Sequence, residues 1–133
     1  MIIESKIYEC KTRKTINNQK VYIFDEQESY SESFGKEWNA YIDVIDRGWK
    51  KDAKTTIEWM LGFPLDLLKG KNIIDIGCGT GRFTREYVKY ANHVVAVDLS
   101  NAIYVNLAPY SSNLTLIKGN LNILHDYLKN FDV

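Results

Sequence analysis

The segment IIDIGCGTGRF, residues 73–83, constrains the fold more than any other part of this chain. A short apolar run with strand composition leads into three glycines at alternate positions, Gly77, Gly79 and Gly81, and helical spacing follows. Glycine has no Cβ, so the backbone can turn sharply and approach a ligand closely, and the first amides of a helix offer unpaired N–H groups. The segment therefore predicts a strand–turn–helix unit that cradles a nucleotide or an anion.

A carboxylate at the end of the next apolar run strengthens this interpretation. The run VVAVD ends in Asp98. When such a strand lies beside the glycine turn, a carboxylate at its C-terminal end can accept hydrogen bonds from both ribose hydroxyls of a nucleoside. The turn and the acid together are therefore a stronger indication of a nucleoside site than either feature alone.

The rhythm of residues 71–133 predicts an α/β fold with a parallel sheet and flanking helices. A third strand is expected at Leu114–Lys118. Phe83, Tyr87 and Ala91 share one face of a predicted helix between the first two strands, and a shorter helix after Ser100 should stop before Pro109. A last helix is expected to bury a longer set on one face: Leu121, Leu124, Leu128 and Phe131.

Two ligand classes share this arrangement, and the glycine spacing separates them. Dinucleotide-binding turns usually read G-x-G-x-x-G, whereas here the glycines read G-x-G-x-G and Arg82 holds the sixth position. Asp75 lies inside the first strand, where its charge suits an ammonium group better than a pyrophosphate. The pattern thus favours a nucleoside that carries an amino acid.

The motifs DIGCGTGRF and VVAVDLS resemble the Rossmann-like, class I S-adenosylmethionine-dependent methyltransferases, and the upstream segment YSESFGKEWNAY resembles the one that precedes the domain in a bacterial small-molecule type of this family. The resemblance to the domain itself covers residues 65–133. It implies a Rossmann-like parallel sheet that is incomplete, with about three of the family's usual seven strands. It also implies S-adenosyl-L-methionine as the cofactor and methyl transfer to a small-molecule, carbohydrate or lipid acceptor.

The same resemblance assigns the cofactor-binding residues. The glycine turn would face the methionine portion, Asp75 its amino group, Asp98 the ribose, and Leu99 and Leu121 the adenine ring, while Asn120 stands where the family often has an acid that contacts the adenine amine. The full predicted set is Asp75, Gly77, Cys78, Gly79, Gly81, Asp98, Leu99, Asn120 and Leu121. No catalytic residue is identified, because a general base and most acceptor contacts lie beyond the fourth strand in this family.

The N-terminal part is predicted to hold a hairpin or loop extension, residues 1–32, and a helical lead-in, residues 33–70, to the cofactor-binding unit of residues 71–133. Ile7–Thr12 and Lys20–Asp25 are expected to pair across the two asparagines Asn17 and Asn18. A loop over residues 27–36, helices over 37–46 and from Asp52 to Leu61, and a turn over 65–69 that ends at Gly70 should follow. By resemblance, the lid candidates are Tyr30, Phe34 and Trp38.

Composition and charge argue against several other classes of protein function. The 133 residues include 17 basic and 17 acidic side chains, so no bulk charge attracts nucleic acid or an anionic membrane. No apolar run approaches the roughly 20 residues of a membrane span. Two cysteines far apart, and histidines without partners at ligand spacing, predict no metal site and a cytoplasmic location.

The chain is expected to be a truncated methyltransferase whose fourth strand starts at residues 131–133. An unpaired edge on the first strand of the sheet would then favour pairing with another chain, hence self-association, or with the N-terminal hairpin. Two alternatives stay open: a non-catalytic module that binds S-adenosylmethionine, and a nicotinamide- or flavin-dependent oxidoreductase fragment, which the glycine spacing and Asp75 disfavour.

Overall fold

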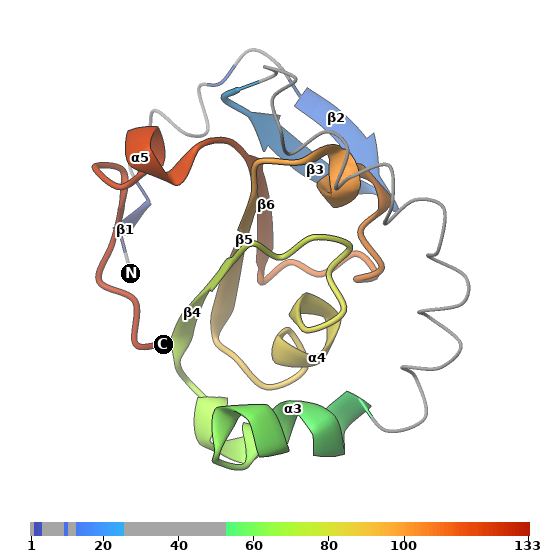
Figure 1. Cartoon of the computed structure of the whole chain (residues 1–133), viewed down its shortest axis with the longest axis vertical. Coiled ribbons are helices and arrows are strands. Elements are labelled where there is room, and N and C mark those ends of the chain that lie inside the picture. Colours follow the sequence, from blue (N-terminus) through green and yellow to red (C-terminus); the bar gives the residue numbers. More distant parts are fainter. Residues whose placement is uncertain (1, 4–9, 11–12, 26–52) are drawn as a thin grey trace.

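The computed structural model describes residues 2–3, 10, 13–25 and 53–133 (Figure 1). The predicted loop and helix over 27–46, and the lid candidates Tyr30, Phe34 and Trp38, lie outside the described residues. No helix in the described ranges is both long and apolar enough to cross a membrane.

A five-stranded sheet forms the centre of the structure, in the order β2-β3-β6-β5-β4 (Figure 1). Strands β3, β6, β5 and β4 run parallel, and β2 is antiparallel to β3. The bounds of these strands are Arg13–Ile16 for β2, Gln19–Ile23 for β3, Asn72–Ile76 for β4, His93–Asp98 for β5 and Leu114–Lys118 for β6. The three strands predicted after residue 71 are therefore confirmed, and the α/β class with them.

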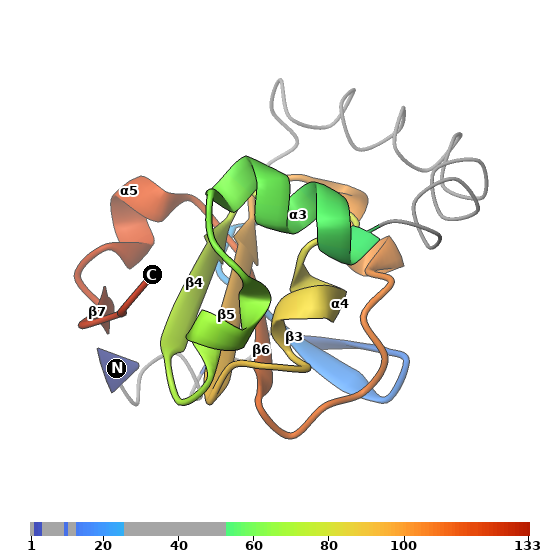
Figure 2. The ribbon, with the colours of Figure 1, turned by 90° about the horizontal axis from the view of Figure 1, so that it is seen from below.

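Both faces of the sheet are covered, as expected for parallel strands with near-continuous apolar sequence. Helices α3, Ala53–Leu61, and α4, Thr84–Tyr87, lie on one side of β4 and β5, and α5, Leu121–Leu124, lies on the other (Figures 1 and 2). Ile57 and Leu68 are buried on the first side, and Leu124 on the second. These two cores fix the sheet whose C-terminal edge carries the site.

The predicted hairpin exists, but the strand that pairs with β3 is β2 at Arg13–Ile16, whereas most of the predicted first strand, Ile7–Thr12, lies outside the described residues. Asn17 and Asn18 both have positive φ, 50° and 62°, so they form a two-residue turn and the strand must end at Ile16. The hairpin joins the sheet at β6, through β3. The expectation that it covers the exposed edge of the first parallel strand is therefore wrong.

The segment that leads into the parallel sheet follows its prediction. Helix α3 ends at Leu61 beside Gly62, whose φ is 76°. A 3₁₀ turn, η1 at Leu65–Leu68, follows Pro64, and Gly70, with φ 74°, delivers the chain to β4.

The helix predicted over Phe83, Tyr87 and Ala91 is shorter than its spacing suggests. Only α4 is regular, and the chain continues as turns in which the Ala91 amide donates to the Tyr87 carbonyl at 2.9 Å. The rings of Phe83 and Tyr87 still stack, with centroids 6.4 Å apart. After β5, Ser100 caps the 3₁₀ helix η2, Asn101–Val105, as predicted, by accepting from the Ala102 amide.

The single helix predicted over Leu121–Phe131 is wrong. Helix α5 ends at Leu124, and Leu128–Lys129 form β7, which pairs antiparallel with β1, Ile2–Ile3. Leu124 and Leu128 nevertheless share the same core cluster. Burial of both therefore explains the apolar spacing, without a continuous helix.

The outer edge of β4 carries the last residues of the sequence. The Asp132 amide donates to the Asn72 carbonyl at 2.8 Å, and the Ile74 amide donates to the Val133 carbonyl at 2.9 Å. Residue numbers therefore increase in the same direction along β4 and along the segment paired with it, as the prediction of a fourth parallel strand starting at residues 131–133 requires. Ile76, at the upper end of this edge, remains 58% exposed.

Candidate functional site

The glycine segment after β4 forms a bend that only glycines adopt without strain. Gly77, Gly79 and Gly81 all have positive φ, 71°, 54° and 79°. The amides of Gly77 and Cys78 both donate to the carbonyl of Val97, at 2.8 and 3.1 Å. The bend is therefore fixed against the end of β5.

Asp98, the last residue of β5, lies at the mouth of this bend. Its Oδ2 accepts from the Gly79 amide at 2.7 Å, and its Oδ1 accepts from the Ser100 amide at 2.7 Å. The sequence prediction that the glycine bend and this carboxylate converge is confirmed in the structure. A carboxylate has about four lone-pair positions, so two acceptor positions remain for a ligand.

A cavity of about 380 Å³ opens at the C-terminal edge of the three strands β4, β5 and β6. Its size lies within the range of roughly 300–1,000 Å³ that is typical of ligand pockets. It is lined by Ile76, Gly77, Val97, Asp98, Leu99, Gly119, Asn120, Leu121 and Asn122. Five predicted site residues, Gly77, Asp98, Leu99, Asn120 and Leu121, thus line one cavity.

Asn120 reaches this cavity from the N-terminus of α5. Its Oδ1 accepts from the Asn122 amide at 2.9 Å, which makes it the N-cap of the helix. A carboxamide oxygen has two lone pairs, so capping leaves a second acceptor position. Local helix capping accounts for the orientation of the Asn120 side chain at the rim of the cavity.

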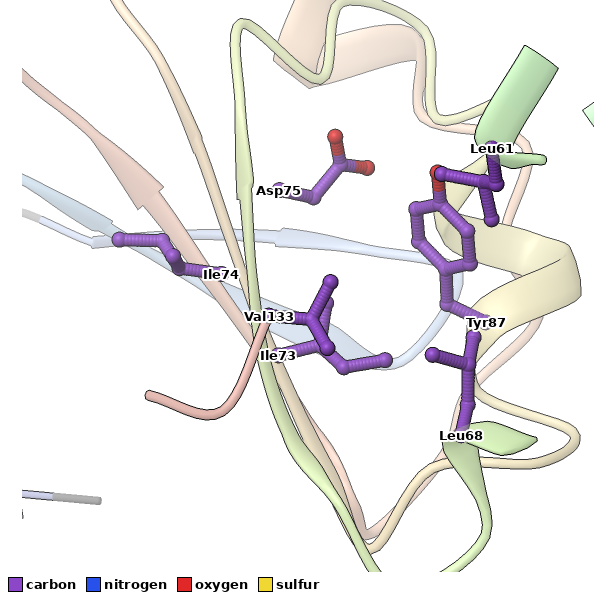
Figure 3. Close-up of a pocket in the computed structure, with 7 residues that line it drawn as sticks. All are labelled: Leu61, Leu68, Ile73, Ile74, Asp75, Tyr87 and Val133. Carbon is purple, nitrogen blue, oxygen red and sulfur yellow. The ribbon is translucent and has the colours of Figure 1, made fainter. Parts of the chain in front are cut away.

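Asp75 lies in β4 but lines a different cavity, of about 180 Å³, between the sheet and the helices (Figure 3). The hydroxyl of Thr84 donates to its Oδ2 at 2.6 Å. Burial raises the pKa of Asp75, the Thr84 hydrogen bond opposes that rise, and the charge of Asp98 adds to it. In Figure 3 the carboxylate points into the cavity that the Tyr87 ring also faces. Burial, followed by the charge of Asp75, raises the pKa of Tyr87 to about 12.

Asp75→Asn is expected to raise the thermal midpoint of the free protein at neutral pH. The folded-state pKa of Asp75 lies above its unfolded value, so its contribution to stability is fully present below the unfolded pKa and is lost as pH rises through the folded pKa. Asparagine has the same size and can still accept from Thr84. Melting curves across the acid range should show the two proteins converging at low pH. A variant that melts below the wild type at neutral pH would contradict this account.

Cys78 sits between two glycines, with its side chain packed against the core on the α3 side of the sheet. Burial raises the pKa of its thiol well above the usual value, and the charges of Asp75 and Asp98 raise it further. The neutral thiol is a poor nucleophile. Cys78, like Gly79 and Gly81, does not line the 380 Å³ cavity.

One residue beside the bend has no signal in the sequence. Asn106 follows η2, is 2% exposed, and lies so close to Gly81 that a Cβ there would meet its side chain at 2.6 Å or less. The neighbouring Leu107 amide donates to the Thr80 carbonyl at 2.6 Å. Only the three-dimensional approach of the two segments identifies Asn106.

Within the described ranges, no group of three or more His, Cys, Asp or Glu side chains could hold a metal ion.

Comparisons with known proteins match part of the chain. Residues 73–133 match the family described as methyltransferase domain. Protein arginine N-methyltransferase 1 of Saccharomyces cerevisiae is 39% identical over 66 residues, which are 45% of this chain and 19% of that protein. Phosphoethanolamine N-methyltransferase 1 of Triticum aestivum is 32% identical over 77 residues, 58% of this chain and 15% of that protein. The chain thus spans less than a fifth of the length of these curated relatives.

Among solved structures, the chain is similar to phosphoethanolamine N-methyltransferase 1 of Haemonchus contortus, in complex with phosphoethanolamine and S-adenosylhomocysteine. The TM-score is 0.45 with 24% sequence identity, and the match covers 66% of this chain and 21% of the other. The matched family begins at Ile73 and includes both the glycine bend and Asp98. Residues 73–133 of this chain are therefore similar to a methyltransferase domain, and both curated relatives are named as methyltransferases.

Proposed function

We propose that this chain binds S-adenosyl-L-methionine in the 380 Å³ cavity and takes part in methyl transfer to a small-molecule, carbohydrate or lipid acceptor. The observation that carries the proposal is the convergence of Gly77, Asp98 and Asn120, from the ends of three adjacent strands, on that one cavity. Ligands of open parallel sheets bind in crevices at this edge.

The residues of the cavity fit an adenosyl group. Asp98 offers its remaining lone pairs to the two ribose hydroxyls, and Leu99 and Leu121 supply apolar surface for the adenine ring. Asn120 offers its second acceptor position to the adenine amine. The bend leaves room for the methionine portion at Gly77 and Gly79, where a Cβ would meet nothing within 4 Å.

Asp75 has the chemistry to hold the amino group of that portion. Its carboxylate is buried, and an ammonium group would compensate the charge that burial disfavours. Since Asp75 lines the neighbouring cavity, the contact would run through water or reach across the bend. Asp75→Asn should therefore weaken cofactor binding while it stabilises the free protein.

The sulfonium of the cofactor supplies an activated methyl group, so the protein mainly has to align the acceptor with it and exclude water. The carboxyl groups of Asp75 and Asp98 would lie near the sulfonium, where negative charge stabilises the bound cofactor. The printed names of the wheat and nematode relatives state that they methylate phosphoethanolamine, which supports a small-molecule acceptor. The acceptor group needs a general base from the protein only if it is a hydroxyl.

Calorimetry with S-adenosylhomocysteine and with NAD tests the proposal. We expect saturable binding of S-adenosylhomocysteine and none of NAD, because the glycine spacing departs from the dinucleotide pattern and the charge of Asp75 disfavours a neighbouring pyrophosphate. Binding of NAD alone would instead support the oxidoreductase alternative. If S-adenosylhomocysteine binds, a methyl-release assay with phosphoethanolamine separates an active protein from a non-catalytic module that only binds the cofactor.

We also propose that the protein is cytoplasmic and has no nucleic-acid or membrane partner, in line with its balanced charge. The proposal also includes self-association through the outer edge of β4, where Ile76 is exposed above the positions paired with Asp132 and Val133. Light scattering at tens of micromolar should then detect a dimer. A strictly monomeric species would remove this part of the proposal.

A further inference from the structure

The β2–β3 hairpin lies outside the segment that matches the methyltransferase domain, yet it extends the same sheet (Figure 1). Because β3 runs parallel to β6, the chain after β3 emerges at the edge where the 380 Å³ cavity opens. The hairpin therefore has two routes to the site, one from its turn and one from its exit.

The turn of the hairpin contacts the residue that supports the glycine bend. The Nδ2 of Asn17 donates to the backbone carbonyl of Asn106 at 3.1 Å. The Oδ1 of Asn106 accepts from the Ala108 amide at 2.9 Å, which fixes the side chain that presses against Gly81. One hydrogen bond thus links the hairpin turn to the segment on which the bend rests.

A second contact holds the hairpin on the same segment. The ammonium of Lys14 in β2 lies 4.2 Å from the ring centroid of Tyr104 in η2. Since Asn106 directly follows η2, the hairpin contacts both the 3₁₀ helix and the residue after it.

The exit of the hairpin contacts the strand behind the adenine end of the cavity. The Phe24 amide donates to the Lys118 carbonyl at 2.8 Å, and the buried ammonium of Lys118 donates to the Asp25 carbonyl at 2.9 Å. Lys118 is in register with Asp98, and Gly119, the next residue, lines the cavity. A Cβ on Gly119 would lie 3.2 Å from the Phe24 Cβ.

From these contacts we infer that the β2–β3 hairpin is a positioning element of the cofactor site, with Asn17 acting through Asn106 on the glycine bend. The inference rests on the proposed binding of S-adenosylmethionine. It assigns a role in cofactor affinity to residues that precede the matched domain. Asn17 contacts no ligand in this account, because it acts only through the segment behind the bend.

The turn offers a matched pair of variants. Asn17→Gly and Asn18→Gly each place glycine at a position with positive φ, so the backbone change is the same and favourable in both. Asn17→Gly removes the hydrogen bond to Asn106, whereas the side chain of Asn18 has no hydrogen bond within the described ranges. Asn17→Asp keeps the size of the side chain but replaces the donor with an acceptor.

Calorimetry with S-adenosylhomocysteine should show an affinity about three- to fivefold lower for Asn17→Gly than for Asn18→Gly, and lower still for Asn17→Asp, at similar melting temperatures. Amide hydrogen exchange should be faster at Gly79 and Gly81 in Asn17→Gly and unchanged in the middle of β5. These two amides report on the bend itself, so a general loss of stability would not reproduce the pattern.

The results separate the two hypotheses. If the wild type fails to bind S-adenosylhomocysteine, the proposed function fails. If the wild type binds and both glycine variants bind equally well, with unchanged exchange at the bend, the hairpin has no positioning role while the proposed function stands. A lower affinity for Asn17→Gly that exceeds the change in Asn18→Gly supports the inference.

Discussion

Asp98→Ala is expected to lower the affinity for S-adenosylhomocysteine by about 100-fold. Two ribose hydroxyls would donate to this carboxylate, and a hydrogen bond to a charged group contributes about 1.5–3 kcal/mol, so the loss of both corresponds to two orders of magnitude or more. The carboxylate is already oriented by the amides of Gly79 and Ser100, so binding costs little reorganisation. Titration calorimetry of the variant and the wild type measures the difference.

Asp126→Ala is the matched control for this experiment. Asp126 follows α5, and its side chain is 72% exposed beside His125, so its removal changes the net charge equally without touching the cavity. Its affinity should match the wild type. Because Asp98→Ala also leaves two amides without their acceptor, its melting temperature must be measured beside its affinity. Asp98→Asn serves if the alanine variant unfolds, since it keeps the size and one acceptor oxygen.

An Asp98→Ala protein that is folded and binds S-adenosylhomocysteine as tightly as Asp126→Ala would remove Asp98 from the ribose contact. That outcome would leave the match of residues 73–133 to the methyltransferase domain intact. It would place the adenosine away from the mouth of the glycine bend. Affinity therefore tests the site separately from the family.

The parallel strands and the glycine bend could be predicted from sequence because short-range chemistry determines them. Continuous apolar runs predict buried parallel strands, and glycines at alternate positions predict the positive φ values seen at 77, 79 and 81. Asp98 could be predicted because it ends a strand next to that bend. Ser100 could be predicted as a cap because the residues around it are local in sequence.

The elements that sequence reasoning missed depend on contacts distant in the chain. Leu128 has helical spacing with Leu124, yet it lies in β7, which pairs with β1 near the other end of the chain, and it shares a core cluster with Leu124. A hairpin across Asn17 and Asn18 was expected, but its place in the sheet comes from the parallel pairing of β3 with β6, a contact distant in sequence to which Gln19 adds a side-chain hydrogen bond to the Leu114 carbonyl. Asn106 supports the bend from a segment that is distant in sequence, and no spacing of residues along the chain predicts this contact.

Gly81→Ala should be the most destabilising single substitution in the glycine bend, at about 2–5 kcal/mol. An alanine at φ 79° pays roughly 1–2 kcal/mol for its left-handed conformation. Its Cβ would also lie 2.6 Å from the Asn106 carboxamide carbon, and overpacking in a buried site costs typically 1–3 kcal/mol more. Urea unfolding of the free protein measures the total, which is a large fraction of the stability of a small domain.

Gly62→Ala isolates the backbone part of this cost. Gly62 has φ 76°, nearly that of Gly81, and a Cβ there would meet nothing within 4 Å. It should therefore lose only the roughly 1–2 kcal/mol of the left-handed conformation. The excess loss in Gly81→Ala then measures the contact with Asn106.

A double-mutant cycle assigns that excess to its partner. Asn106→Ala removes the carboxamide, so the free energy of unfolding lost through Gly81→Ala should be smaller by about 1 kcal/mol or more in that background. Asn106→Ala alone is also destabilising, because the Ala108 amide loses its acceptor. Equal costs in both backgrounds would mean that the segment after η2 moves aside freely. The Asn106 side chain would then give the bend no support, and the bend would be held by the Val97 carbonyl and by the Leu107 amide at Thr80.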